Sequence, residues 1–393
     1  MQWASKVSEE FNLKDAMAEC IASVQKDLNN VKPDLAVVFV SPHHTPEFSD
    51  IPRVLAEKLG PRVLIGCSAG GVIGGGKEVE DRTAFALTGA VMPGVDLTGF
   101  HVDEMDLPDG DAGPATWERI IGVQAATNPN FIVLVDPFTI RGENLLAGLD
   151  YAFPGGVKVG GLASGASQPG QTALFMGDTL YFSGAVGLSV SGNLRVDAVV
   201  AQGCRPVGPP MAVTKCERNL LQELDGMPPM DVLREIYEKA GEHDRVLIQQ
   251  ALHLGVSTDP LKEVGRPGDF LMRNVLGLHQ ESKALVIGEL LHEGQLVQFH
   301  LRDAQSAEED LSVLLRRYSE DSDFDKPSGA LLFQCVGRGA NLFGRPDHDP
   351  EMFKTLVGPS PIGGFFCQGE IGPVGSNTYL HGFTSSFAIF RPK

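Results

Sequence analysis

The stretch Leu35-Ala-Val-Val-Phe-Val40 decides the fold, because its kind returns twice along the chain, as Phe131-Ile-Val-Leu-Val135 and as Ala330-Leu-Leu-Phe-Gln-Cys335. Each stretch is a short apolar run rich in β-branched or aromatic residues, which predicts a buried strand. A glycine turn follows the end of each run after 26, 26 and 29 residues. These turn glycines are Gly66, Gly161 and Gly364. The spacing indicates three copies of one structural unit.

Each copy has room for a helix between its apolar run and its glycine turn. Thr45-Pro46-Glu47 and Asp349-Pro350-Glu351 each offer an N-cap residue, a proline at the first helical position and an acid near the positive helix end. The second copy has Arg141-Gly142-Glu143-Asn144 in that place. Strand, helix and strand predict a parallel pair with a right-handed connection. Hairpin-like segments follow, so we predict an α/β (mixed α+β) fold with mixed sheets.

The length of 393 residues exceeds the size at which a single core keeps growing, so we expect two domains. We predict an N-terminal helix in residues 1–30 and a first domain with two copies in residues 31–215. The second domain is expected at 216–393, with the third copy at 329–392. A proline-rich stretch from Cys204 to Met211 marks the end of the first two copies.

Composition narrows the class of protein. The formal charge of −18, from 32 basic and 50 acidic residues, argues against a nucleic-acid partner. No apolar run approaches the roughly 18 to 20 residues of a membrane span, and the first residues lack a signal-peptide pattern. Six cysteines without a CxxC pair indicate a reducing compartment. We therefore expect a cytoplasmic protein that engages neither membrane nor nucleic acid and holds no cofactor or metal.

Two glycine-rich motifs suggest familiar enzyme sites but lack their context. Gly66-Cys-Ser-Ala-Gly70 fits GxSxG, with Ser68 as the nucleophile, yet that motif needs a helix next and Gly71 to Gly76 is a poor helix start. The same glycines satisfy GxxxxGK, but Glu78 follows where a serine or threonine is required, so we reject nucleotide hydrolysis. His43-His44 and Asp347-His-Asp349 could bind metal, but solvated loops are favoured because their spacing is not that of metal ligands.

The third copy holds the densest set of polar residues. Its members are Cys335, Arg338, Asn341, Cys367, Glu370 and His381. Because the carboxyl ends of parallel strands share one edge of a sheet, these residues should face one another. The second copy would place Asp136 and Arg141 in the same way, and the first copy Ser68.

An arginine between glycines, as in Gly337-Arg338-Gly339, suits capture of a carboxylate or phosphate, because its fork donates two hydrogen bonds. The alternative is that Arg338 pairs with Glu370 and ties two loops together. Both interpretations stay open at this point.

The motifs resemble a known family. Cys335-x-Gly-Arg-Gly339, Gly363-Gly-Phe-Phe-Cys-Gln-Gly-Glu-Ile-Gly-Pro-Val374 and Leu380-His-Gly382 look like the C-terminal half of FIST (F-box and intracellular signal transduction) proteins. Leu64 to Gly71 and Val199 to Pro206 resemble the N-terminal half. The resemblance implies a sensory module that binds small ligands such as amino acids and passes the signal to a protein partner. We expect a stand-alone member without an F-box, and the resemblance transfers no catalytic residues.

These observations predict a small-ligand-binding signal transduction protein. Arg338 would hold the carboxylate of an amino acid or similar anionic or zwitterionic metabolite, and Glu370 its ammonium group. Two alternatives stay open. One is an enzyme that uses Cys335, Cys367 or Ser68 as its nucleophile. The other is a scaffold that binds a protein and no metabolite.

Overall fold

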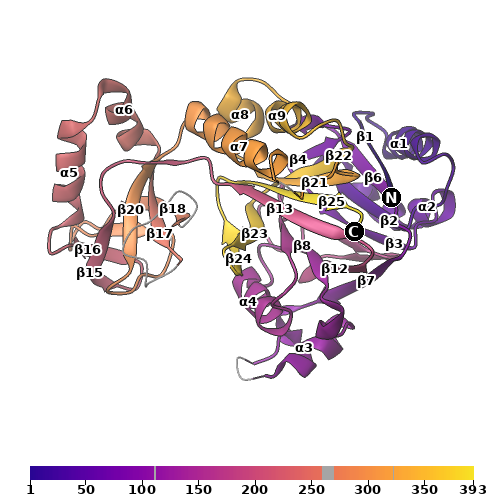
Figure 1. The fold of residues 1–393 in the computed structure, drawn as a ribbon, viewed down its shortest axis with the longest axis horizontal. Helices are drawn as coiled ribbons and strands as arrows, with labels where there is room; N and C mark the ends of the chain where they lie inside the picture. Colours follow the sequence, from indigo (N-terminus) through magenta and orange to yellow (C-terminus); the bar gives the residue numbers. More distant parts are fainter. Residues whose placement is uncertain (110–111, 259–269, 322) are drawn as a thin grey trace. The chain divides into compact units, whose positions relative to one another are not determined.

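The computed structural model describes residues 1–109, 112–258, 270–321 and 323–393, and it divides into two compact units (Figure 1). The main unit comprises Met1–Val200 and Ser312–Lys393, and the inserted unit comprises Ala201–Leu311. The division in space therefore differs from the one predicted along the sequence, because the third copy rejoins the first two. Both units contain helices and sheets, and the sheets of the main unit are mixed, which confirms a mixed α+β fold in two domains.

Each of the three predicted copies forms a parallel strand pair with an antiparallel third strand. In the first copy, β2 (Leu35–Val40) runs parallel to β3 (Val63–Ser68) and antiparallel to β6 (Phe85–Val91). The same arrangement holds for β8, β9 and β12, and for β21, β22 and β25. Their bounds are Asn130–Val135, Lys158–Leu162, Ala185–Gly192, Gly329–Cys335, Ile362–Cys367 and Ser385–Arg391. The threefold repeat and the parallel pairing are confirmed.

The pairing of the strands shows that the predicted alignment of the turn glycines is off by one residue in the second copy. Val38 pairs with Gly66, Val133 with Gly160 and Leu332 with Gly364. A Cβ atom at each of these glycines would lie 1.9 to 2.0 Å from the carbonyl oxygen of its partner residue. The equivalent of Gly66 and Gly364 is therefore Gly160, and not Gly161, since all three positions require a close approach of backbone to backbone.

Helices α2 (Asp50–Lys58), α4 (Gly142–Ala152) and α9 (His348–Leu356) connect the parallel strands. The predicted helix starts were wrong in two copies. Thr45-Pro46-Glu47 lies in the 3-10 helix η1 (Pro42–Glu47), before α2 begins. Asp349 is already inside α9, which starts after Asp347. A strand that was not predicted precedes the N-terminal helix expected in residues 1–30. Residues Gln2–Ser8 form strand β1, which pairs with β6 before α1 (Leu13–Asp27) begins.

The hairpin of each copy leaves its own sheet and joins another. β4 (Gly71–Gly74) with β5 (Lys77–Glu80) extends the third sheet at β22, and β10 (Leu174–Met176) with β11 (Thr179–Tyr181) extends the first sheet at β3. β23 (Gly369–Val374) with β24 (Asn377–His381) extends the second sheet at β9. The exchange is cyclic, so each copy gives a hairpin and receives one.

The opposite edge of each sheet also takes a strand from outside its own copy. β7 (Val95–Val102) follows the first copy and pairs with β12 of the second, and β13 (Arg195–Ala201) follows the second copy and lies beside β25 of the third. β1 fills the same position beside β6 of the first copy. Within the described residues, the main unit therefore contains three six-stranded sheets of equivalent construction.

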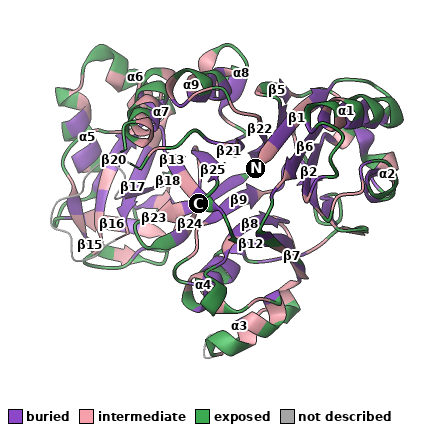
Figure 2. Cartoon of the chain, turned by 45° about the vertical axis from the view of Figure 1, so that its right-hand side comes forward, coloured by how far each residue is buried: buried purple, intermediate pink, exposed green. Residues whose placement is uncertain are grey.

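One hydrophobic cluster draws on all three sheets, with Phe39, Leu134 and Phe333 among its buried residues. The rings of Phe39 and Phe365 stack with centroids 4.7 Å apart and so join the first copy to the third. Figure 2 shows the strands of the main unit largely buried, while helices α1 and α2 expose one side. This shared core fixes the positions of the strand ends, where the candidate site residues lie.

The inserted unit is a strongly bent antiparallel sheet with two helices. Its strand order is β14-β20-β15-β16-β19-β18-β17, and β20 (Leu296–Leu301) also pairs with β17 (Leu252–Ser257), so the sheet closes on itself. The other strands are Arg205–Pro206, Met211–Glu217, Leu220–Leu224, Leu285–Ile287 and Phe270–Leu278. Helices α5 (Pro229–Lys239) and α6 (Glu242–Gln250) belong to this unit. Helix α7 (Ala304–Ser319) leads the chain back into the main unit.

Candidate functional site

The segments that follow β3 and β9 meet the end of β22 around one buried serine. The Ser164 hydroxyl, which follows β9 in the second copy, accepts a hydrogen bond from the Gly70 amide at 2.9 Å and donates one to the Phe366 carbonyl. Gly70 belongs to the first copy and Phe366 to the third, so a single side chain connects all three. A Cβ atom at Gly165 would lie 2.9 Å from the Gly70 nitrogen, which shows how closely the turns approach.

Ser68 serves the backbone in a similar way. It is buried at the end of β3, and its hydroxyl accepts a hydrogen bond from the Ala173 amide at 3.0 Å. The next residues, Gly71–Gly74, form strand β4 and not the helix that a nucleophile elbow needs. The GxSxG match therefore lacks the geometry of that motif.

The third copy brings Cys335, Arg338 and Glu370 together at the carboxyl end of β21. Arg338 is fully buried, and its Nε and Nη2 atoms donate to the two carboxylate oxygens of Asp349 at 2.8 and 3.0 Å. Burial opposes the charge of Arg338, but Asp349 outweighs it and raises the pKa of Arg338. Cys335 and Glu370 lie close enough to act on the same guanidinium. The arginine thus forms its ion pair with Asp349, a partner that the sequence reasoning did not assign.

The other predicted members of this cluster are held by the backbone. Glu370 accepts a hydrogen bond from the Thr384 amide at 2.9 Å, and it lies opposite His381, whose Nε2 contacts the Gly372 carbonyl at 3.0 Å. Cys335 pairs in register with Cys367, and burial raises the pKa of the Cys367 thiol well above its usual value. Asn341 is exposed on helix α8 (Gly339–Phe343) and does not join the buried cluster.

Three buried polar atoms at this edge have no hydrogen-bond partner among the described residues. They are Gln334 Oε1, Arg338 Nη1 and Ser385 Oγ. Gln334 and Ser385 lie directly opposite each other in β21 and β25, and the Arg338 amide bonds to the carbonyl of Cys335, the residue after Gln334. A buried polar atom left unpaired is costly, so such atoms usually bind water or a ligand. Sequence reasoning missed Gln334 and Ser385, although a glutamine inside an apolar strand run is a usable signal.

The hairpin received from the first copy forms one wall of this cluster. Glu78 on β5 accepts a hydrogen bond from Gln334 Nε2 at 2.8 Å and another from the Asp347 amide at 2.6 Å. Its own amide donates to Asp347 Oδ1 at 2.6 Å. Burial, with a further contribution from the negative charge of Asp349, raises the pKa of Glu78 to about 8. Glu78 therefore carries a proton over much of the neutral range.

The predicted residues of the second copy lie in different surroundings. Asp136 is fully buried after β8 and accepts a hydrogen bond from the Thr139 hydroxyl. Arg141 is exposed and its Nε donates to Glu104 at 2.7 Å. Arg141 also lines a pocket of about 570 Å³ that contains Trp117. The two side chains therefore do not form one site.

Neither a cluster of metal-binding side chains nor a helix fit to span a membrane occurs in the part of the chain that the structure describes. No group of three or more histidine, cysteine, aspartate or glutamate side chains there is placed to hold a metal ion. No described helix combines the length and the apolar character that crossing a bilayer requires.

Comparison with known proteins finds two domain models of one family along this chain. The FIST N domain model matches residues 34–227, and the FIST C domain model matches residues 229–373. The chain belongs to the FIST family. An uncharacterized protein of Mycobacterium tuberculosis is 36% identical over 384 residues, which cover 98% of each chain.

Two further relatives are more distant. An uncharacterized protein of Mycobacterium bovis is 34% identical over 377 residues, covering 96% of this chain and 95% of its own. An F-box/LRR-repeat protein of Arabidopsis thaliana is 24% identical over 312 residues, covering 67% of this chain and 58% of its own.

Proposed function

We propose that this chain is a sensory protein that binds a small amino-acid-like metabolite at the carboxyl end of β21. The observation that carries the proposal is the set of three unpaired buried atoms, Gln334 Oε1, Arg338 Nη1 and Ser385 Oγ. They comprise an acceptor, a charged donor and a hydroxyl that can do either. A zwitterion presents the complementary groups.

Charge fixes the orientation of the proposed ligand. Its carboxylate accepts from Arg338 Nη1, the nitrogen that Asp349 leaves unused. Its ammonium group donates to Gln334 Oε1, and the carboxylate of Glu370 supplies negative charge nearby. The ligand thereby supplies hydrogen bonds that the buried atoms otherwise lack, which is where its binding energy comes from.

The same contacts offer a route for a signal. Gln334 is hydrogen-bonded to Glu78, which lies on the hairpin exchanged from the first copy. A ligand on Gln334 therefore favours one arrangement of this hairpin over another, and a protein partner that senses the hairpin reads the occupancy. An enzyme with Cys367 or Ser68 as nucleophile has less support, because burial raises the pKa of Cys367 and the Ser68 hydroxyl is bonded to the backbone.

The test is a thermal-midpoint screen with amino acids, organic acids and phosphorylated metabolites. A compound at 100 times its dissociation constant adds roughly 2.7 kcal/mol to the free energy of unfolding. Ser385→Ala removes one proposed contact and weakens binding of the best compound about fivefold, which corresponds to about 1 kcal/mol. Arg338→Lys keeps the charge but loses the fork, and it weakens binding further.

The neighbouring serine is a matched control. Ser386 Oγ donates to the Ile371 carbonyl at 3.1 Å, so Ser386→Ala loses a structural hydrogen bond and some stability but leaves binding unchanged. A screen in which no compound raises the midpoint contradicts the proposal. Binding that Ser385→Ala and Arg338→Lys both leave unchanged contradicts the location.

A further inference from the structure

A second concavity lies at the opposite end of β25 from Ser385. It has a volume of about 520 Å³, and all the described residues that line it belong to the main unit. Arg391, at the last position of β25, is in its wall, whereas Ser385 begins that strand. Seven residues of extended chain separate the two ends by roughly 20 Å. The pocket is therefore distinct from the ligand site proposed above.

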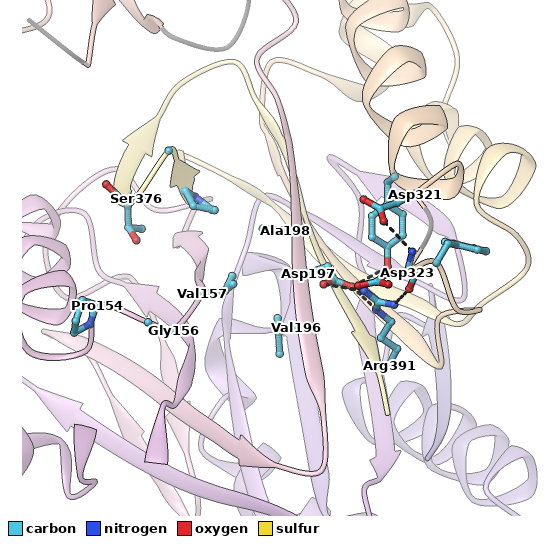
Figure 3. Close-up of a pocket in the computed structure, with 16 residues that line it drawn as sticks. Pro154, Gly156, Val157, Val196, Asp197, Ala198, Asp321, Asp323, Ser376 and Arg391 are labelled. Atoms are coloured by element: carbon cyan, nitrogen blue, oxygen red, sulfur yellow. Dashed lines mark hydrogen bonds and ion pairs between the residues drawn. The ribbon is translucent and has the colours of Figure 1, made fainter. Parts of the chain in front are cut away.

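Charged side chains gather on one side of this pocket (Figure 3). Asp197 on β13 accepts hydrogen bonds from Arg391 Nε at 2.6 Å and from the Tyr318 hydroxyl at 3.0 Å. Arg391 also donates to the main-chain carbonyl of Asp323. Burial, and then the Asp197 charge, raise the pKa of Tyr318, so the phenol keeps its proton. This wall is fixed by side chains that hold one another in place.

The wall carries more negative than positive charge. Arg391 is the one cation among the described residues that line the pocket, and Asp197 already neutralises it. The carboxylates of Asp321 and Asp323 remain, and Asp321 Oδ1 accepts from the Asp323 amide at 2.9 Å. Arg195 lies 3.8 Å from Asp323, so among the described residues Asp321 is the carboxylate of this wall with no ion-pair partner. The pocket thus favours a positively charged guest.

The rest of the lining is apolar or uncharged. Val157, Val196 and Ala198 lie between the charged side and the far side, where Figure 3 places Pro154, Gly156 and Ser376. An inorganic cation would gain little from such a surface, and no described cluster of acids there is placed to hold a metal ion. The volume falls within the range of small-molecule sites, about 300 to 1,000 Å³.

We infer that this pocket binds an organic amine with an apolar stem. The ammonium group lies between the carboxylates of Asp321 and Asp323, and the stem packs along Val157, Val196 and Ala198. Ser376 and the glycine backbone contact whatever polar group the far end of the molecule carries. The inference rests on the shape and charge of this pocket alone, so it does not depend on the site at β21.

Two amines with neutral counterparts of the same shape test the inference directly. Benzylamine is compared with benzyl alcohol, and cyclohexylamine with cyclohexanol, by isothermal titration calorimetry. Both amines bind and both alcohols bind at least tenfold more weakly. The double variant Asp321→Asn, Asp323→Asn keeps the hydrogen bond to the Asp323 amide but removes two charges, and it weakens amine binding at least tenfold.

Two control variants separate the possible causes of failure. Asp178→Asn removes an exposed acid in the turn between β10 and β11 and leaves amine affinity unchanged. Ser385→Ala also leaves it unchanged, because that residue belongs to the other site. Equal binding of amine and alcohol overturns the inference, as does an amine affinity that the double variant does not alter. A loss of the same size in Asp178→Asn overturns it too, since it shows mere attraction to an acidic protein.

Discussion

Gln334 of the third copy donates a hydrogen bond to Glu78 on the hairpin that the first copy gives away, across 2.8 Å. The two residues are 256 positions apart in the sequence. Their contact links an exchanged hairpin to the strand end where the candidate ligand site lies. It also places the buried carboxyl group of Glu78 at a junction between copies, so the stability of the protein should depend on pH.

Stability should fall as pH rises through the neutral range, because the pKa of Glu78 is raised from 4.5 to about 8. Between these values the folded state keeps a proton that the unfolded chain releases, so the contribution of Glu78 is full below pH 4.5 and is lost by about pH 8. The loss is at most about 5 kcal/mol, at roughly 1.4 kcal/mol for each pH unit. Urea unfolding at several pH values measures it.

Glu78→Gln isolates this effect from the other titrating groups. The variant cannot ionise, and the Gln334 amide can turn so that its oxygen accepts from the new amide. The difference in unfolding free energy between variant and wild type should therefore shift in favour of the variant as pH rises. A difference that stays constant from acid to neutral pH contradicts the raised pKa.

Removal of one partner of the Arg338–Asp349 ion pair should strongly lower the free energy of unfolding. Asp349→Asn leaves a buried guanidinium without its counter-charge, and we expect a loss of about 3 to 5 kcal/mol in the free energy of unfolding. Glu351 pairs with Arg345 at 2.6 Å, but both side chains are more than half exposed. Glu351→Gln should therefore cost less than about 1 kcal/mol. Equal losses in the two variants contradict the assignment of a buried pair.

Ser164→Ala should weaken the junction of the three copies. It leaves the Gly70 amide and the Phe366 carbonyl without their partner, and each buried group left unpaired costs about 1 to 3 kcal/mol. Ser167→Ala, three residues later at an exposed position, is the control and should change stability by less than about 0.5 kcal/mol. Chemical denaturation measures the free energy of unfolding of the two variants. A Ser164→Ala variant as stable as Ser167→Ala would show that the Ser164 hydroxyl does not stabilise the junction.

Gly160→Ala tests the corrected alignment of the glycine turns. The added Cβ would lie 1.9 Å from the Val133 carbonyl oxygen, so the two parallel strands must separate and the protein loses several kcal/mol or fails to fold. A Cβ added at Gly382 would meet no described atom within 4 Å, so Gly382→Ala should be tolerated. Thermal midpoints of the two variants decide between these outcomes.

The Cys367 thiol should react with iodoacetamide only after unfolding. Its burial raises its pKa, and the same holds for Cys67, so the native protein presents little thiolate at these positions at neutral pH. Mass spectrometry of native and unfolded samples locates the modified residues. Rapid native labelling of Cys367 would revive the alternative of a cysteine nucleophile.

The repeated strands could be predicted from the sequence because they are buried on both faces, so Leu35–Val40 and its two counterparts read as continuous apolar runs. The turn glycine of the second copy could not be assigned, since Gly160 and Gly161 are adjacent and only the register shows which one faces Val133. Asp349 looked like a helix cap because proline follows it. Its carboxylate instead turns toward Arg338, 11 residues earlier.

The candidate site was predictable only in part. Cys335, Arg338 and Glu370 meet because strand ends of one sheet edge meet, which topology requires. Gln334 and Ser385 depend on which strand pairs with β21 and in what register, and Glu78 depends on the hairpin exchange. The order of the strands in the sequence predicts neither the partner of β21 nor the hairpin exchange, because a hairpin can extend any sheet edge within reach. The amine pocket depends likewise on Asp197 and Arg391, which are 194 residues apart.

The cyclic exchange of hairpins makes the order of synthesis important. When the ribosome has released the second copy, strand β9 already exists, but the hairpin that covers its edge, Gly369–His381, is still to be made. Hairpin β4–β5 is likewise made long before β22, the strand with which it pairs. An uncovered sheet edge invites pairing with other chains. The nascent protein therefore passes through a long interval with uncovered sheet edges, and a chain that stops just before residue 369 lacks the hairpin that covers the edge of β9.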